Sequence, residues 1–204
     1  HDQSRASALA TLLQCARSAY EITGLAYQSG DGQPQARSLI RLEGAASAVA
    51  QQAASLKDEI SGDDGSYQIG TVDAGDSATI WDEVRERPLS VDVDVERWRF
   101  AIPPASANHL IEGLGSLGLE RYLVDWAGGL IWAALPPSSD PVRLHALATA
   151  HGGTAWRFAR GPDDPNDHAF SPLEPGLERL NRTLKSTMDS RGRLNPGCML
   201  PPDA

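Results

Sequence analysis

The sequence predicts an α+β fold: a ferredoxin-like βαββαβ unit with an enlarged antiparallel sheet and helices packed on one face. The prediction depends on residues 97–158, where WRFAI, ERYLVDW, LIWAAL and TAWRF have the composition of strands. The segments 105–115 and 140–150 between them have the pattern of helices. Short turns join these elements, as that unit requires.

An internal repeat supports the same unit. AIPPASANHLIEGLG at 101–115 and ALPPSSDPVRLHALA at 134–148 share a strand end, a Pro-Pro pair, a serine and a helix. Prolines cannot continue a strand, and Ser106, or Ser139 and Asp140, can cap the helix that follows.

The first half of the chain predicts elements that extend this sheet. It has helical patterns at 6–18 and 45–60 and strand patterns in EITGLAYQ and ARSLIRLEG. Residues 61–79 predict a loop with at most one short strand, YQIGTV. SATIWDEVRE predicts a short helix capped by Ser77 or Thr79. We therefore expect one domain over 1–204. Within it, 1–96 gives a sheet extension and acidic loop, 97–158 the βαββαβ unit, and 159–204 a loop, a last helix and a tail.

Composition excludes several classes of protein. The 204 residues carry a net charge of -9 without a run of Lys and Arg, which argues against a nucleic-acid surface. No apolar run reaches the roughly 18–20 residues of a membrane span, and residues 1–20 do not resemble a signal peptide. The two cysteines, Cys15 and Cys198, predict a cytosolic protein with free thiols; a disulfide between them is the alternative.

Two motifs have structural explanations that we favour. GLGSLG at 113–118 follows a helix instead of opening one, so it predicts a helix end and a turn, not a dinucleotide site. VDVDVE at 91–96 places Asp92, Asp94 and Glu96 on one side of an extended segment, either as cation ligands or, as we favour, as the solvated face of an edge strand. The histidine spacing predicts no metal site.

Aromatic residues and one arginine suggest a cleft. Trp126 and Trp132 flank the turn in DWAGG, and Trp156 lies on the last strand, where these side chains either line a cleft or belong to the core. Arg160, after that strand, either pairs with a substrate carboxylate or cofactor phosphate or is a surface residue.

The tail has an unusual pattern. A helix at 177–188 has an apolar stripe that predicts a buried face: Leu177, Leu180, Leu184 and Met188. Pro196 and Gly197 then fix a turn, and Asn195, which precedes a proline, is predicted to be extended and to present its amide.

The tail resembles the C-terminal signature of FAD-linked oxidases of the vanillyl-alcohol oxidase superfamily, in which a helix with a Lys is followed by Asp-Pro-x-Gly-x-x-Asn-Pro-Gly. Ser190 stands where proline is usual; the matching residues are Lys185, Asp189, Gly192, Leu194, Asn195, Pro196 and Gly197. ERWRFAIPPA, LVDWAGGLIW, AHGGTAWRFARG and SPLEPGLERL most resemble the glycolate oxidase FAD-binding subunit.

The resemblance implies a C-terminal cap domain of a flavoprotein that acts on glycolate or related 2-hydroxy acids. FAD would be held mainly by an N-terminal domain whose Gly-rich loop has no counterpart here. The chain lacks an initiator Met, so we expect a fragment that is inactive by itself. Asn195, Pro196 and Gly197 would lie near the cofactor, and Arg160 is the further candidate there.

The implied partners are a catalytic flavoprotein subunit and an iron–sulfur subunit, in the cytoplasm or at the inner membrane through the complex. Catalytic relatives carry an HxH-type motif that this sequence lacks, which argues against direct substrate oxidation by this subunit. The alternative is a non-catalytic ferredoxin-like module for ligand binding or assembly, because a fold does not carry function.

Overall fold

The chain forms a helix-covered antiparallel sheet in a computed structural model that describes residues 4–30, 36–61, 68–86, 95–159, 169–196 and 200. The described elements are α1 (Arg5–Cys15), β1 (Ile22–Gln28), β2 (Arg37–Leu42), α2 (Ala46–Ile60), α3 (Ala74–Glu86), β3 (Glu96–Ala101), α4 (Ala107–Gly115), β4 (Arg121–Asp125), β5 (Leu130–Leu135), α5 (Pro141–Ala150), β6 (Thr154–Ala159) and α6 (Pro175–Met188). Single 3-10 turns, η1 (Pro104–Ser106) and η2 (Trp126–Gly128), precede α4 and join β4 to β5.

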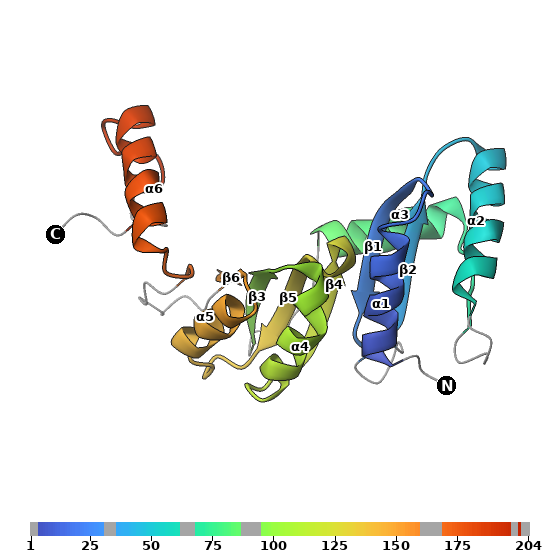
Figure 1. The fold of residues 1–204 in the computed structure, drawn as a ribbon, viewed down its shortest axis with the longest axis horizontal. Helices are drawn as coiled ribbons and strands as arrows, with labels where there is room; N and C mark the ends of the chain where they lie inside the picture. Colours follow the sequence, from blue (N-terminus) through green and yellow to red (C-terminus); the bar gives the residue numbers. More distant parts are fainter. Residues whose placement is uncertain are drawn as a thin grey trace.

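The six strands form one sheet in the order β2-β1-β4-β5-β3-β6, and every described pairing is antiparallel (Figure 1). Strands β3 to β6 with α4 and α5 make the predicted βαββαβ unit, and its first strand, β3, lies between β5 and the edge strand β6. The β1–β2 hairpin pairs with β4 and extends the sheet. The predicted α+β fold with an enlarged antiparallel sheet is confirmed.

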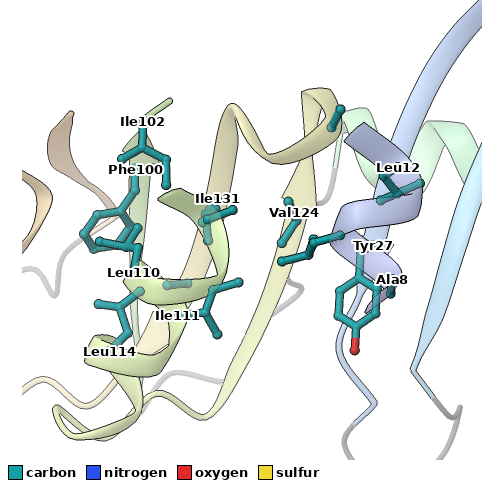
Figure 2. Close-up of a cluster of buried hydrophobic side chains, with 14 of the residues drawn as sticks. Ala8, Leu12, Tyr27, Phe100, Ile102, Leu110, Ile111, Leu114, Val124 and Ile131 are labelled. Carbon is teal, nitrogen blue, oxygen red and sulfur yellow. The ribbon is translucent and has the colours of Figure 1, made fainter. Parts of the chain in front are cut away.

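The main core lies between the sheet and helices α1, α4 and α5. Figure 2 shows the part of this core beneath α1 and α4. Because side chains alternate across a strand, β3 sends Trp98 and Phe100 into this core and turns Arg97 and Arg99 to the opposite face. Fully buried partners come from the helices and neighbouring strands: Leu12, Leu110, Leu114, Leu144, Val124, Ile131 and Leu135. The alternation on β3 is what creates a second, charged face of the sheet.

A smaller apolar cluster lies on that opposite face. It combines Ala26, Leu123, Leu130 and Trp132 from the strands with Val84 from α3, and Trp81 packs against it. Trp81 comes so close to the β1 backbone that a Cβ on Gly24 would lie 2.7 Å from its ring. Helix α3 therefore occupies the β1 end of this face.

Two local predictions in the first half are wrong. Helix α3 begins earlier than predicted because Asp73, not Ser77 or Thr79, accepts the Asp76 N–H (2.9 Å), whereas residues 68–73 form no strand, as the predicted loop allowed. Glu96 does not lie on a solvated edge: it is buried on the central strand β3 and pairs with Arg157 (3.0 Å). Asp92 and Asp94 lie outside the described residues.

Helix caps and glycine turns agree better with the sequence. Asp140 accepts the Val142 N–H (2.9 Å) with Pro141 at the first helical position, as predicted, whereas Ser106 makes no capping bond. GLGSLG ends α4 and turns at Gly118, whose φ of 86° favours glycine, so the predicted helix end and turn are confirmed.

The predicted burial of the last helix is wrong within the described part of the chain. No residue of α6 is buried, and the helix stands apart from the sheet (Figure 1). Its apolar stripe is exposed: Leu177 48%, Leu180 56%, Leu184 51% and Met188 83%. Periodicity identified the stripe correctly, but periodicity does not show what covers a stripe.

Candidate anion-binding site

Arg99 is held between two tryptophans on the open face of the sheet. Its register partners are Trp132 on β5 and Trp156 on β6, and its guanidinium carbon lies 5.3 and 4.5 Å from their ring centres. Cross-strand neighbours on one face are within reach of such contacts. The position of Arg99 is therefore set by three adjacent strands.

Arg97 occupies the next position on the same face. Its guanidinium carbon lies 5.3 Å from the ring centre of Phe158, which in turn packs edge-on against Trp132 at 4.9 Å. The two arginines are two residues apart on one strand, so their Cα atoms are about 6.6 Å apart. We call Arg97 and Arg99 the arginine pair.

A strained turn brings a third tryptophan to Arg99. Trp126 and Ala127 both have φ of 53°, and the Trp126 N–H donates to Asp125 Oδ1 (2.7 Å). The Trp126 ring is 61% exposed and lies 5.8 Å from the Arg99 guanidinium. Two successive left-handed residues without glycine are costly and concentrate at functional sites. The turn presents an aromatic side chain at the entrance.

The arginine pair lacks counter-charges in the described part of the chain. No ion pair or hydrogen bond joins either guanidinium to a described residue, and both Nε atoms are buried without a partner. Other arginines nearby are neutralised, since Arg41 pairs with Glu43 (2.9 Å) and Arg85 with Asp82 and Glu86 (both 2.8 Å). Buried N–H groups without partners in a native fold call for an explanation.

Asp125 is the nearby acid whose charge is disfavoured. Burial raises the pKa of its carboxyl, against the opposing effects of the Trp126 N–H and the positive charge of Arg99. It is not within ion-pair distance of Arg99. Asp125 therefore lines the same cavity without forming an ion pair with Arg99.

These side chains line an open cavity of about 750 Å³, which is within the range of roughly 300–1,000 Å³ usual for small-molecule sites. Its walls include Arg97, Arg99, Asp125, Trp126, Trp132, Phe158 and Trp81. Guanidinium groups bind carboxylates through paired N–H bonds, and aromatic walls strengthen such bonds by excluding water. The arrangement is suited to a small organic anion.

The predicted site residues lie elsewhere. Asn195 and Pro196 are exposed in the tail and are not among the described residues that line the cavity; Arg160 and Gly197 lie outside the described part. The predicted extended conformation of Asn195 is wrong, because its φ is 42°. Asparagine tolerates this left-handed region, which here overrides the bias of a residue before proline.

The tail signature nevertheless makes a closed turn. Lys185 Nζ donates to Asp189 Oδ2 (2.5 Å) and to the Leu194 carbonyl, and Asp189 accepts the N–H groups of Arg193 (3.0 Å) and Leu194 (2.9 Å). These donors, Lys185 first, lower the pKa of Asp189 to about 2. Gly192 turns the chain with φ of 60°. The Lys, Asp and Gly of the signature thus fix the direction in which Asn195 leaves the helix.

The arginine pair was not predicted from the sequence. Trp132 and Trp156 were left open between cleft and core; both flank Arg99, and Trp132 lines the cavity. The missed signal was the alternation in ERWRFA, where charged residues alternate with Trp98 and Phe100 on a strand predicted to lie inside the sheet. A charge at every second position of an interior strand indicates a functional face.

Comparison with known proteins gives one relative. Over 120 residues, or 58% of the chain, the sequence is 31% identical to glycolate oxidase subunit GlcE of Escherichia coli strain K12. The chain spans only 30% of the length of that protein. No family model and no solved structure matches the chain.

In the described residues, no group of three or more His, Cys, Asp or Glu side chains is placed to hold a metal ion. No helix in the same part is long and apolar enough to cross a membrane. The chain is thus similar to a glycolate oxidase subunit, and its most distinctive described site is the arginine pair.

Proposed function

We propose that this chain is the C-terminal cap domain of a flavoprotein oxidoreductase subunit that acts in the oxidation of glycolate or related 2-hydroxy acids. FAD would be held mainly by an N-terminal domain outside this chain. The similarity to the glycolate oxidase subunit, the confirmed fold and the tail signature support this proposal. The observation that carries it is the arginine pair, with buried Nε atoms that lack partners.

Arg99 of the arginine pair would bind the substrate carboxylate. Arg99 is fixed by Trp132 and Trp156, so its planar N–H groups are oriented before a ligand arrives and little side-chain entropy is lost on binding. Trp126 would cover the bound acid and exclude water. These residues bind and orient the acid, and FAD, when bound, supplies the hydride acceptor for the hydroxyl-bearing carbon.

The tail would contribute contacts to the cofactor. The described tail residues fit such a role, because Asn195 and Pro196 are exposed on a turn that Lys185 and Asp189 hold in place. An asparagine amide both donates and accepts hydrogen bonds and so suits the polar edge of a flavin. Gly197 and Arg160 belong to the same proposed contact.

The exposed stripe on α6 would pack against the flavin-binding domain, where burial of its leucines is favourable. Further partners in the proposal are a catalytic flavoprotein subunit and an iron–sulfur subunit. This subunit would then orient a 2-hydroxy acid or support the catalytic subunit, which is consistent with its lack of an HxH motif.

The test uses the full-length protein that contains this chain, purified with its natural partners. We expect a bound-flavin absorbance spectrum that glycolate bleaches in the absence of oxygen, and an Arg99→Met variant that keeps the flavin but needs much more glycolate. The control is Arg143→Met, which removes an exposed arginine from α5 outside the cavity. A preparation without flavin, or an Arg99→Met variant reduced as readily as the control, would count against the proposal.

A further inference from the structure

The arginine pair has more positive charge than one carboxylate needs. We propose that the site takes 2-hydroxy acids with a second carboxylate, Arg99 binding the carboxylate next to the hydroxyl group and Arg97 binding the second one. This inference rests on the proposed function and specifies its substrate class.

The charge of the two arginines favours a ligand with two carboxylates. A monocarboxylate would neutralise one guanidinium and leave the other without a described counter-ion, with its Nε buried. Arg41 and Arg85 do not change this count, because each has its own acid. An unpaired charge in a half-buried position is less well solvated than one at the surface, so a dianion matches the site better than a monoanion.

The aromatic contacts of the two guanidinium groups also favour two carboxylate positions. The guanidinium carbon of Arg99 lies over the rings of Trp156 and Trp132, and that of Arg97 lies over the ring of Phe158. Stacking covers the faces of a guanidinium and leaves its N–H groups free in the plane, where a carboxylate binds with two parallel bonds. The site therefore offers two separate carboxylate positions.

The distance between the two arginines also fits a short dicarboxylate. Single C–C bonds of about 1.5 Å place the carboxyl carbons of an extended four- or five-carbon dicarboxylate about 4–5 Å apart. The two arginines originate about 6.6 Å apart on the strand, and their long side chains can converge over that difference. A two-carbon acid such as glycolate can engage only one of the two positions.

Direct binding measured by tryptophan fluorescence tests this inference on the full-length protein. Trp126, Trp132 and Trp156 surround Arg99, so occupancy should change their emission. The matched probes are malate against 2-hydroxybutyrate and 2-hydroxyglutarate against 2-hydroxyvalerate, which differ only in the second carboxylate. We expect each dicarboxylate to bind about ten-fold more tightly or better.

The variants separate the two positions. Arg97→Met should abolish the preference for dicarboxylates, whereas Arg99→Met should weaken the binding of both dicarboxylates and monocarboxylates. Equal wild-type affinities within each matched pair overturn the inference even if Arg97→Met fails to fold. If monocarboxylates bind and reduce the flavin in that case, the proposed function stands; if no 2-hydroxy acid binds or reduces it, the proposed function itself fails.

Discussion

Arg99 stacks on Trp156 at 4.5 Å, on the face of the sheet opposite the helix-covered core. The two residues are register partners on β3 and β6, so the sheet itself aligns the cation with the ring. Replacing Trp156 by Leu should leave the strand intact but free the guanidinium. We expect carboxylate affinity to fall about three- to thirty-fold, from the roughly 0.5–2 kcal/mol of a cation–π contact, as measured by calorimetric titration with glycolate. An affinity unchanged from wild type would show that Trp156 does not orient Arg99.

Asp125→Asn should stabilise the fold at neutral pH. Because burial raises the pKa of Asp125, its charged form is less favourable in the folded state than in the unfolded state. Stability is therefore lost as the pH rises from the unfolded pKa, about 3.9, through the raised folded pKa, and the loss persists at higher pH. Asparagine can still accept the Trp126 N–H.

Urea unfolding of wild type and Asp125→Asn at pH 7 and pH 3 measures this effect. The variant should be more stable at pH 7 and show little gain at pH 3, where the wild-type carboxyl is protonated in both states. It should also bind glycolate more tightly at pH 7, because a negative charge beside Arg99 is gone. A variant that is less stable at pH 7 would mean that the Asp125 charge stabilises the turn.

Gly128→Ala should damage the entrance of the site. Gly128 has φ of 112°, and a Cβ there would lie 2.8 Å from the Pro104 carbonyl oxygen. We expect a loss of roughly 1–3 kcal/mol in the free energy of unfolding and a changed near-UV spectrum from Trp126. The matched control is Gly115→Ala at the end of α4, where a Cβ would meet nothing within 4 Å. Equal stability of the two variants would contradict the steric argument.

Glu96→Gln should destabilise the centre of the sheet. Glu96 accepts from Arg157 Nη1 (3.0 Å) and from Trp98 Nε1 (3.1 Å), and all three residues are buried. Removing one charge of a buried pair costs about 3–5 kcal/mol, which chemical denaturation should report. Glu112→Gln, in an exposed pair with Arg5, serves as the control and should change stability little. A small effect at Glu96 would mean that Arg157 is neutralised in another way.

The tail turn should be insensitive to mild acid. The pKa of Asp189 is lowered to about 2 by Lys185 and by the N–H groups of Leu194 and Arg193. Its contribution to stability is present above the unfolded pKa, about 3.9, and is lost as the pH falls through about 2. Carboxyl NMR titration should show that Asp189 ionises at a pH well below that of ordinary aspartates, and an ordinary pKa would mean that the turn is open.

Under the proposed function, deleting residues 189–204 should also lower the flavin content.

The order of elements in the second half was predictable because both helix and strand periods were clear there, and Pro-Pro pairs marked the strand ends. The position of Glu96 was not. Glu96 follows several acids in a polar stretch of sequence. It is an interior residue only because β3 has a strand on each side and because Arg157, on the neighbouring strand β6, forms an ion pair with it. That ion pair joins residues 61 positions apart, beyond the reach of local patterns.

The site was predictable only in part. Trp132 and Trp156 were candidates for a cleft, but the register that places Arg99 between them is a property of the assembled sheet. The left-handed turn at Trp126 also breaks the local rule that favours glycine, so no residue preference announces it. The tail signature, in contrast, is local, and its Lys185–Asp189 contact joins residues one helical turn apart.

The most direct test of the central claim is an NMR titration of arginine Nε–H signals in the full-length protein, with glycolate added in the absence of oxygen. We expect a saturable shift of the Arg99 signal, with the Arg143 signal unmoved. An unmoved Arg99 signal, or equal small drifts of all arginine signals, would contradict the assignment of a carboxylate site to this face of the sheet.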